Sequence, residues 1–207
     1  MEFDLHIHSN YSYDSLMKPK QIVKVSKKRG LDGIAITDHG TILGGEKAFR
    51  DNKDQNFQVI IGSEINTEYG EIIGLFLNEE IKQEELNVIL DEIHDQDGIS
   101  ILVHPYRNHR LVNELVTKVD AIEVFNARSK KWENEMASIL ANKFNKPKVA
   151  GSDSHTIFEI GRGKTVIDSL TKDSLLSGKS KTEGEESNYY LVHGLSFVIE
   201  TIHRMTK

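Results

Sequence analysis

Cysteine is absent from this chain of 207 residues. Its absence excludes disulfides and thiolate ligands, so any bound metal must be held by histidine, aspartate or glutamate. Long apolar runs are also lacking, since none approaches the roughly 20 residues that a membrane-spanning helix needs. The first residues include neither a basic segment nor an apolar one of the kind that directs export. We therefore expect a globular protein of the cytoplasm that makes no membrane contact.

The chain has no excess of positive charge, because 26 Lys and Arg face 32 Asp and Glu, for a formal net charge of −6. This balance disfavours an extended surface for the phosphate backbone of nucleic acids. Two or three bound divalent cations would add about +4 to +6 locally, so an acidic chain can still have a positive site. The length fits a single domain, 1–207, with the motif-bearing part at 1–170.

Short apolar runs alternate with longer amphipathic stretches, which is typical of an α/β fold with a largely parallel sheet. The sequence predicts seven strands, at residues 2–7, 33–37, 57–62, 71–77, 99–103, 121–125 and 148–151. It predicts helices at residues 19–29, 45–52, 82–96, 110–117, 130–144 and 191–205. Residues 63–70 are too few for a helical crossover, so one βα unit is irregular. The polar stretch 177–188 is expected to be an exposed loop.

Side chains able to bind metals follow five of the predicted strands. The first strand ends in His6-Ile7-His8, where the period-two alternation points both imidazoles to one side of the sheet. The other four strand ends carry Asp38-His39, Glu64, His104 and Asp153-Ser154-His155. In a βα barrel the C-terminal ends of the strands form one face, where such enzymes hold their chemistry. We therefore predict that these side chains converge.

Imidazole and carboxylate ligands without thiolate suit Zn²⁺, Mn²⁺ or Fe²⁺. Carboxylates such as Glu64 and Asp153 can bridge two ions, which predicts a site with more than one metal. Each residue taken alone also has a structural explanation, since an Asp after a strand often caps the next helix and His104 before Pro105 can mark a turn. Five coincidences of strand end and ligand side chain argue against that explanation for the whole set.

Together these residues resemble the polymerase and histidinol phosphatase (PHP) family, whose pattern is an HxH, a (T)DH, a Glu, an HP and a late DxH. All occur here in order from His6 to His155, and the resemblance extends to about Arg162. It implies a distorted (β/α)₇ TIM-like barrel in a single domain with two or three divalent metal ions, Mn, Zn or Fe. It also implies hydrolysis of a phosphate mono- or diester by a metal-bridging hydroxide at a di- or trinuclear site.

The resemblance also implies roles for individual residues. One ion would be surrounded by His6, His8, Glu64 and Asp153, with the two carboxylates bridging. His104 would complete a second ion, and a third would be bound by Asp14, His39 and His155. Glu71 stands where some relatives have a histidine ligand, and Glu123 and Asn126 compete with it for this ninth position.

Asp153, His39 and His155 are the candidate catalytic residues, because Asp153 would bridge the ions and either histidine, or a second metal-bound water, would protonate the leaving alkoxide. Candidate phosphate clamps through bidentate contacts are Arg107, Arg128 and Arg162. Solvated or helix-capping roles explain each arginine equally well. The histidines that end no strand are expected to be helix or surface residues, namely His94, His109, His193 and His203.

Two other functions remain open at this point. An amidohydrolase-like enzyme uses a similar HxH and a late Asp to cleave C–N bonds, although such barrels are generally longer and carry a Lys bridge where this chain has Glu64. A non-enzymatic PHP module would bind metal for structure or serve a polymerase partner. For an enzyme, the expected partner is a small phosphorylated substrate, a nucleotide or an oligonucleotide end, and the oligomeric state is open.

Overall fold

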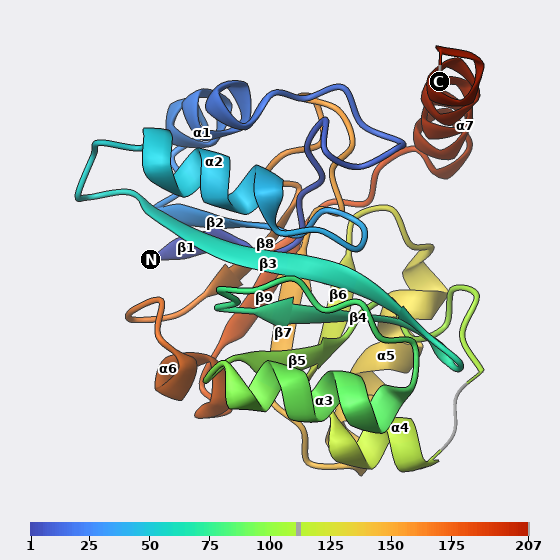
Figure 1. The fold of residues 1–207 in the computed structure, drawn as a ribbon. Helices are drawn as coiled ribbons and strands as arrows, with labels where there is room; N and C mark the ends of the chain where they lie inside the picture. The colour runs from blue at the N-terminus through green and yellow to red at the C-terminus, as the bar shows by residue number, and fades with distance from the viewer. Residues whose placement is uncertain (111–112, 207) are drawn as a thin grey trace.

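A computed structural model describes residues 1–110 and 113–206, and in these residues one curved sheet of nine strands is surrounded by helices (Figure 1). The strands are β1 (Glu2–Asp4), β2 (Gly33–Ile36), β3 (Gln58–Thr67), β4 (Gly70–Leu75), β5 (Ile99–Leu102), β6 (Ala121–Asn126), β7 (Lys148–Gly151), β8 (Gly163–Val166) and β9 (Lys181–Gly184). The helices are α1 (Pro19–Lys28), α2 (Leu43–Asp51), α3 (Leu86–Asp95), α4 (Asn113–Lys118), α5 (Lys131–Lys143), α6 (Lys172–Leu176) and α7 (Tyr189–Thr206).

The sheet is nearly closed into a barrel, with the strand order β7-β6-β5-β4-β3-β2-β1-β8-β9. Pairing is parallel from β1 to β3 and from β5 to β7, whereas β4 runs antiparallel to both of its neighbours. A parallel bridge between Ile7, just after β1, and Ser154, just after β7, brings β7, at one end of the sheet, back beside β1. The C-terminal ends of β1 and β7 therefore lie side by side, and each carries predicted ligands.

Local sequence explains several strands and helices of this barrel. Residues 33–36 of β2 are fully buried, as expected for a parallel strand covered on both faces. Helix α1 begins at Pro19, whose fixed φ suits the first turn, and Gly30 follows its end at a φ of 81°. Helix α3 buries one stripe formed by Leu86, Ile89, Leu90 and Ile93.

The predicted barrel-like α/β fold is confirmed, and all seven predicted strands are present. The irregular unit is the β3–β4 hairpin, in which Glu64 lies inside β3 and not after it. The prediction of a loop throughout 177–188 is wrong, because residues 181–184 form β9 and pair with β8. The side chains of β9 are largely exposed, so its backbone pairing leaves no apolar pattern in the sequence.

The predicted helices are observed with boundaries shifted by a few residues, and the short helix α6 is an addition to them. Residues 111 and 112, in the predicted helix 110–117, lie outside the described residues. Among the helices that the structure describes, none combines the length and apolar character required to cross a membrane.

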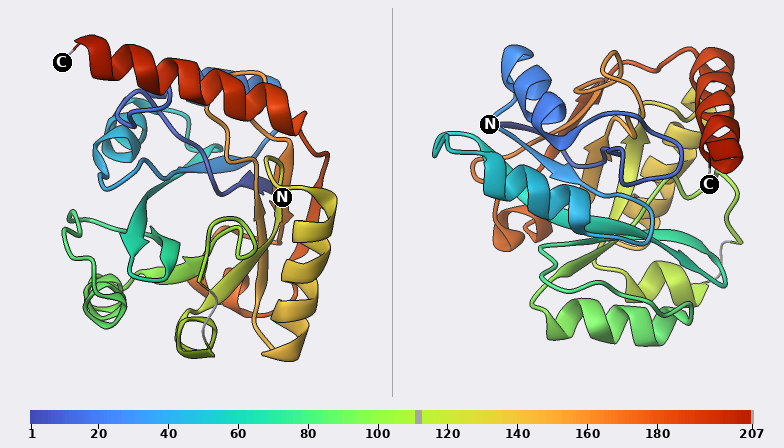
Figure 2. Two further views of the ribbon diagram at one scale, coloured as in Figure 1. Left: turned by 90° about the vertical axis from the view of Figure 1, so that its right-hand side faces the viewer. Right: turned by 45° about the horizontal axis from the view of Figure 1, so that its top comes forward.

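Helix α7 stands apart from the other helices, at the rim of the molecule (Figures 1 and 2). Near the beginning of α7, the carbonyl of Val192 accepts a hydrogen bond of 2.6 Å from Nη2 of Arg128, a residue that follows β6. Near its end His203 Nδ1 donates to the carbonyl of Tyr13 at 2.5 Å, in the loop after β1. The helix therefore extends from the C-terminal end of β6 to the C-terminal end of β1.

Candidate metal centre

The two histidines of the HxH motif follow β1 and lie on the same side of the sheet, as their alternation predicts. Their Nε2 atoms are 3.1 Å apart, and both side chains are buried. The intervening Ile7 is fully buried on the opposite side. Each Nε2 atom faces Glu64, with Oε2 at 3.4 Å from His6 and 3.2 Å from His8.

Glu64 and Asp153 join the groups of ligand atoms to one another. Asp153 Oδ1 lies 3.5 Å from His6 Nε2 and 3.4 Å from His8 Nε2. The second oxygen of Glu64, Oε1, lies 3.0 Å from His104 Nε2. Asp153 and His104 adopt positive φ values of 54° and 27°, which are unfavourable for residues with a Cβ and are often found at functional sites. The two carboxylates thus occupy the positions expected of bridging ligands.

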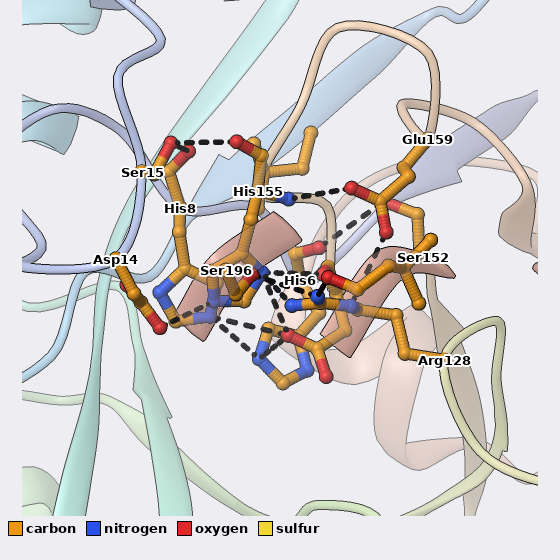
Figure 3. A network of polar contacts seen from close by, with 12 residues as sticks. His6, His8, Asp14, Ser15, Arg128, Ser152, His155, Glu159 and Ser196 are labelled. Atoms are coloured by element: carbon orange, nitrogen blue, oxygen red, sulfur yellow. Dashed lines mark hydrogen bonds and ion pairs between the residues drawn. The ribbon is translucent and has the colours of Figure 1, made fainter. Parts of the chain in front are cut away.

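A further group is built around Asp14, in the loop after β1. Its Oδ2 atom lies 2.7 Å from His155 Nε2 and 3.3 Å from His39 Nε2. His8 belongs to the same group, because ligand atoms of all four residues lie within 4.8 Å of one another. Figure 3 shows Asp14, His8 and His155 converging from different segments of the chain.

Glu71, on β4, points toward this site. Its oxygens lie 3.9 Å from His39 Nδ1 and 3.8 Å from His104 Nε2, and its side chain is 27% exposed. Ligand atoms of Glu71, Glu64 and His39 also lie within 4.8 Å of one another. The structure therefore brings together all nine candidate metal ligands, and Glu71 is among them.

Glu123 and Asn126, the competitors of Glu71, lie behind the ligands. Oε1 of Glu123 accepts from His6 Nδ1 at 3.0 Å, and Oε2 accepts from the backbone N–H of His104 at 2.9 Å. Asn126 Nδ2 donates to Oε2 of Glu123 at 3.0 Å and to Asp153 Oδ2 at 3.3 Å. Both oxygens of Glu123 are thus occupied, and its carboxylate orients ligands from behind.

Ser12 orients the imidazole of His8 in the same way. Its hydroxyl lies 3.1 Å from His8 Nδ1 and donates to Asp38 Oδ1 at 3.0 Å. With that donor used, the hydroxyl oxygen accepts from His8 Nδ1 and from the N–H of His39. In both histidines of the HxH motif Nδ1 is then the nitrogen that keeps its proton, and Nε2, which faces the carboxylates, is the nitrogen that would bind a metal after losing its own proton.

The residues fit a cluster of divalent ions. Four overlapping groups of ligand atoms occur among the described residues, and imidazole with carboxylate suits Zn²⁺, Mn²⁺ or Fe²⁺. Within the described chain, the buried oxygen Asp14 Oδ1, which faces these groups, has no hydrogen-bond partner. Unsatisfied buried polar atoms are costly, and a bound cation is the partner that would satisfy them.

Electrostatics in the metal-free chain follow from this crowding. Burial lowers the pKa of His8, but Asp153 and Glu64 outweigh it and raise the pKa to about 10. Repulsion from Glu64, together with burial, raises the pKa of Glu71 to about 7. Protons therefore occupy the cluster at neutral pH, and bound metal would displace them.

The PHP domain, as a sequence family, matches residues 4–173 of this chain. The chain belongs to the PHP family. An uncharacterized protein of Methanocaldococcus jannaschii is 42% identical over 143 residues, which are 61% of this chain and 82% of that protein. The resemblance predicted from the strand-end motifs is thus confirmed.

Solved structures share the PHP fold at low sequence identity. A two-domain protein of Bacteroides vulgatus, described as containing a predicted PHP-like metal-dependent phosphoesterase, is similar with a TM-score of 0.76 and 18% identity, covering 96% of this chain and 69% of that one. An amidohydrolase of Chromobacterium violaceum is similar with a TM-score of 0.61 and 13% identity, covering 93% of this chain and 96% of that one. At such identities the likeness establishes the fold alone.

The three predicted phosphate clamps have different positions in this PHP barrel. Arg107 contacts Asp153 through Nη2 and donates from Nη1 to Asn126 Oδ1 at 3.3 Å, at the centre of the site. Arg162 is exposed, donates to the carbonyl of Glu186 at 3.3 Å and lines a separate depression. The structure thus places Arg107 among the ligands and Arg162 away from them.

Arg128 is buried behind the metal ligands. Its Nε atom lies 3.2 Å from Glu159 Oε1, and its Nη1 atom contacts His155 Nδ1. Its Nη2 atom donates to the carbonyl of Val192 and, at 2.8 Å, to Ser196 Oγ (Figure 3). Although Arg128 lines the cavity, most of its donors are already bonded within the protein.

A cavity of about 220 Å³ opens over the ligands, and α7 forms one of its walls. Tyr189, His193 and Ser196 line it, although α7 lies beyond the PHP match at 4–173. His193 Nε2 donates to the carbonyl of Arg128 at 3.2 Å. Burial and the charge of Arg128 lower the pKa of His193 to about 4, so it is neutral at physiological pH. The expectation of a helix residue is met, since His193 lies on α7, and the helix also carries it to the cavity.

His109 was also expected to be a helix or surface residue, and it instead links two parts of the site. Its Nδ1 atom donates to the carbonyl of Arg107 at 2.8 Å, and its Nε2 atom accepts from the N–H of Glu71 at 3.0 Å. Gly70 makes room for the ring, since a Cβ there would come within 2.4 Å of it. A histidine in a loop between predicted elements gives no sequence signal of this role. The other two histidines behave as expected, since His94 bonds to Asp120 at the surface.

Proposed function

We propose that this PHP protein is a metal-dependent hydrolase of phosphate esters that acts on a small phosphorylated molecule or on the end of a short oligonucleotide. One observation carries the proposal: Glu64 and Asp153 each approach both histidines of the HxH motif in the same cavity that Arg107 enters. A cluster of shared carboxylates beside a guanidinium suits a doubly charged phosphoryl group.

Divalent ions held by these residues would supply charge neutralisation at the phosphoryl oxygens and a water-derived nucleophile near neutral pH. The protein contributes orientation, because Glu123 and Ser12 fix the tautomers of His6 and His8. Arg107 would hold a phosphoryl oxygen through its planar fork, at a position set by its contact with Asp153. No protein nucleophile is required for this reaction.

His39 is the better candidate for protonating the leaving oxygen. Burial opposes protonation of His39, but Glu64 and Asp14 raise its pKa overall, and its side chain is 12% exposed at the cavity. His155 differs, because burial and Arg128 lower its pKa to about 3. In the metal-free chain His155 is therefore neutral, whereas His39 favours a proton. With Nε2 turned toward Asp14 and the ions, Nδ1 of His39 would carry the proton that passes to the leaving oxygen.

The size of the cavity favours a small ester or a chain end. Its volume of about 220 Å³ lies below the roughly 300–1,000 Å³ of pockets that enclose whole drug-sized ligands. It therefore suits a phosphoryl group with the first part of its leaving group. The net charge of −6 also offers little attraction to the rest of a nucleic acid.

The test combines elemental analysis with assays on p-nitrophenyl phosphate and bis-p-nitrophenyl phosphate, using the same purified sample. We expect two or more metal ions per chain, turnover that stops on chelation, and recovery with Mn²⁺ or Zn²⁺. A panel of histidinol phosphate, nucleoside monophosphates, 3′,5′-bisphosphates and short oligonucleotides would then define the ester. Full turnover by a His8→Ala, Asp153→Ala variant after exhaustive chelation would refute the mechanism.

The same samples separate the other two functions. Bound metal without ester cleavage would support a non-enzymatic metal-binding module. Cleavage of amides in place of phosphate esters would support the amidohydrolase-like alternative. The chain has Glu64 where the bridging lysine of such enzymes is expected, which favours the phosphoesterase.

A further inference from the structure

Helix α7 presents its apolar side chains to the outside of the molecule. Two of its apolar residues are buried, Val192 and Ile199. Seven large apolar side chains are between 42% and 83% exposed, namely Tyr190, Leu191, Leu195, Phe197, Val198, Ile202 and Met205. A helix at a protein surface normally turns its apolar stripe inward, so this arrangement is the reverse of the usual one.

The exposed residues follow a coiled-coil spacing. Leu191, Leu195, Val198, Ile202 and Met205 succeed one another in steps of four, three, four and three residues. That alternation is the heptad pattern whose apolar seam packs against a second helix. Gly194 lies on the same face, and a Cβ built there would meet nothing within 4 Å, so the seam is open for close approach.

The inward contacts that hold α7 to its own chain are mainly polar. Among the described residues they include the bonds from Arg128 to Val192 and Ser196, from His193 to Arg128 and from His203 to Tyr13, and the contact of Lys130 with the Tyr189 ring. Helices in proteins owe most of their stability to packing of an apolar face, and isolated helices of this length are marginal in water. The outward face of α7 therefore calls for a partner.

A second copy of the chain fits this face better than a lipid surface does. Helices that lie on membranes are rich in Lys and Arg along their polar side, whereas residues 189–206 contain one Arg and no Lys. The seam residues together with the flanking Tyr190 and Phe197 expose on the order of 800 Å², which is the share of one partner in a standard interface. A heptad seam is also self-complementary, as a two-fold interface requires.

We infer that α7 pairs with α7 of a second copy of this chain through the seam formed by Leu191, Leu195, Val198, Ile202 and Met205. The opposite face of the same helix carries Tyr189, His193 and Ser196 into the cavity. Pairing therefore supports one wall of each active site. This link to activity rests on the proposed function, whereas the pairing itself does not.

The experiment is sedimentation velocity on the full metal-loaded chain from about 1 to 100 µM, beside a Leu195→Glu, Val198→Glu variant. We expect a dimer for the unmodified chain and a dissociation constant at least roughly 100-fold higher for the variant, because two charges would enter an apolar seam. The matched control is Phe49→Glu, a 61% exposed aromatic on α2, which should leave the dimer intact. Circular dichroism verifies that each variant is folded.

A monomer over the whole concentration range would overturn the inference, as would a dimer that the double substitution leaves unchanged. Binding of the monomer to vesicles of anionic phospholipid would identify the lipid surface as occupant and would also overturn it. Turnover of bis-p-nitrophenyl phosphate is measured separately, so loss of the dimer is distinguished from absence of esterase activity. Specific activity that falls as the unmodified dimer is diluted, and stays low in the double variant, would support the link to the cavity.

Discussion

Glu123 lies directly behind His6, with Oε1 accepting the proton of His6 Nδ1 at 3.0 Å, although 117 residues separate them. Both side chains are almost completely buried. A carboxylate can only accept, so the contact fixes the proton on Nδ1 and directs Nε2 toward Glu64 and Asp153. This is the arrangement in which a carboxylate orients a metal-binding histidine from its far side.

Replacing Glu123 by Gln should weaken metal binding about 10- to 100-fold while the protein stays folded. The amide keeps an acceptor for His6, but it places an N–H group against the N–H of His104 or the Nδ2 group of Asn126. Titration calorimetry with Mn²⁺ or Zn²⁺ measures the effect. Glu135→Gln, on the exposed side of α5, is the control. Equal affinities in the two variants would show that Glu123 does not orient the ligands.

The positions of the candidate metal ligands could be predicted because two simple rules determine them. Alternation places His6 and His8 on one side of a strand, and parallel strands bring their C-terminal ends to one face. The role of Glu123 could not be predicted in the same way. A carboxylate within a buried strand is equally consistent with a ligand, and its partner becomes visible only when β6, β7 and β1 are placed side by side.

Other features of the site could not be predicted from the sequence, because they depend on contacts between distant segments of the chain. His193 reaches the cavity through a bond to the backbone of Arg128, 65 residues earlier. Arg162 was a reasonable phosphate clamp from its place after the DxH motif, but the chain between β7 and β8 carries it to the surface. Strand β9 forms by backbone pairing of residues that have no apolar pattern.

Replacing Glu71 by Gln should have opposite effects on stability and on metal binding. In the metal-free chain, repulsion from Glu64 and burial raise the pKa of Glu71 to about 7 from an ordinary value of 4.5. A raised carboxyl pKa favours the protonated folded form, so its contribution to stability is complete below pH 4.5 and is lost as the pH rises through 7. The Gln variant carries no charge, so its stability does not fall as the pH rises. It binds metal less tightly, because one candidate ligand oxygen is replaced by an amide nitrogen.

Thermal unfolding of the chelated proteins at pH 5 and pH 8 tests this prediction. We expect the Gln variant to gain stability relative to the unmodified chain at pH 8, by about 1–3 kcal/mol, and to gain less at pH 5. With saturating Mn²⁺ the order should reverse, because metal stabilises the unmodified chain more. A variant that is less stable at pH 8 without metal would contradict the assigned repulsion.

Replacing His193 by Ala should change substrate recognition without changing metal content. The side chain lines the cavity but lies on α7, and its bonded partner is the backbone of Arg128. We expect KM for a phosphate ester to rise about tenfold, since a positioned wall residue is lost while the ligands stay in place. Tyr190→Ala, next to Tyr189 on the outward side of the helix and 83% exposed, is the matched control for helix stability.

The pH profile gives a second readout for His193. Burial and Arg128 lower its pKa to about 4, so it is neutral throughout the range from pH 6 to 8. The ratio of KM between variant and unmodified enzyme should therefore be constant over that range. A ratio that changes near pH 6.5 would mean that His193 titrates as an exposed histidine does, and it would place the ring outside the cavity.

Arg107 and Arg162 provide the sharpest comparison between the sequence-based prediction and the structure. Both were candidate phosphate clamps, but Arg107 contacts Asp153 within the site, whereas Arg162 bonds to a backbone carbonyl at the surface. Arg107→Ala should lower kcat/KM about 100- to 1,000-fold, as expected when a donor to the reacting phosphoryl group is lost. Arg162→Ala should change kcat/KM less than about twofold.

Arg107→Lys should recover only part of the loss, because a single ammonium group cannot contact Asp153 and a phosphoryl group at the same time with the geometry of the planar guanidinium. Metal content measured beside kcat/KM distinguishes a lost phosphate contact from a disturbed Asp153, and equal losses in the two alanine variants would refute the role given to Arg107.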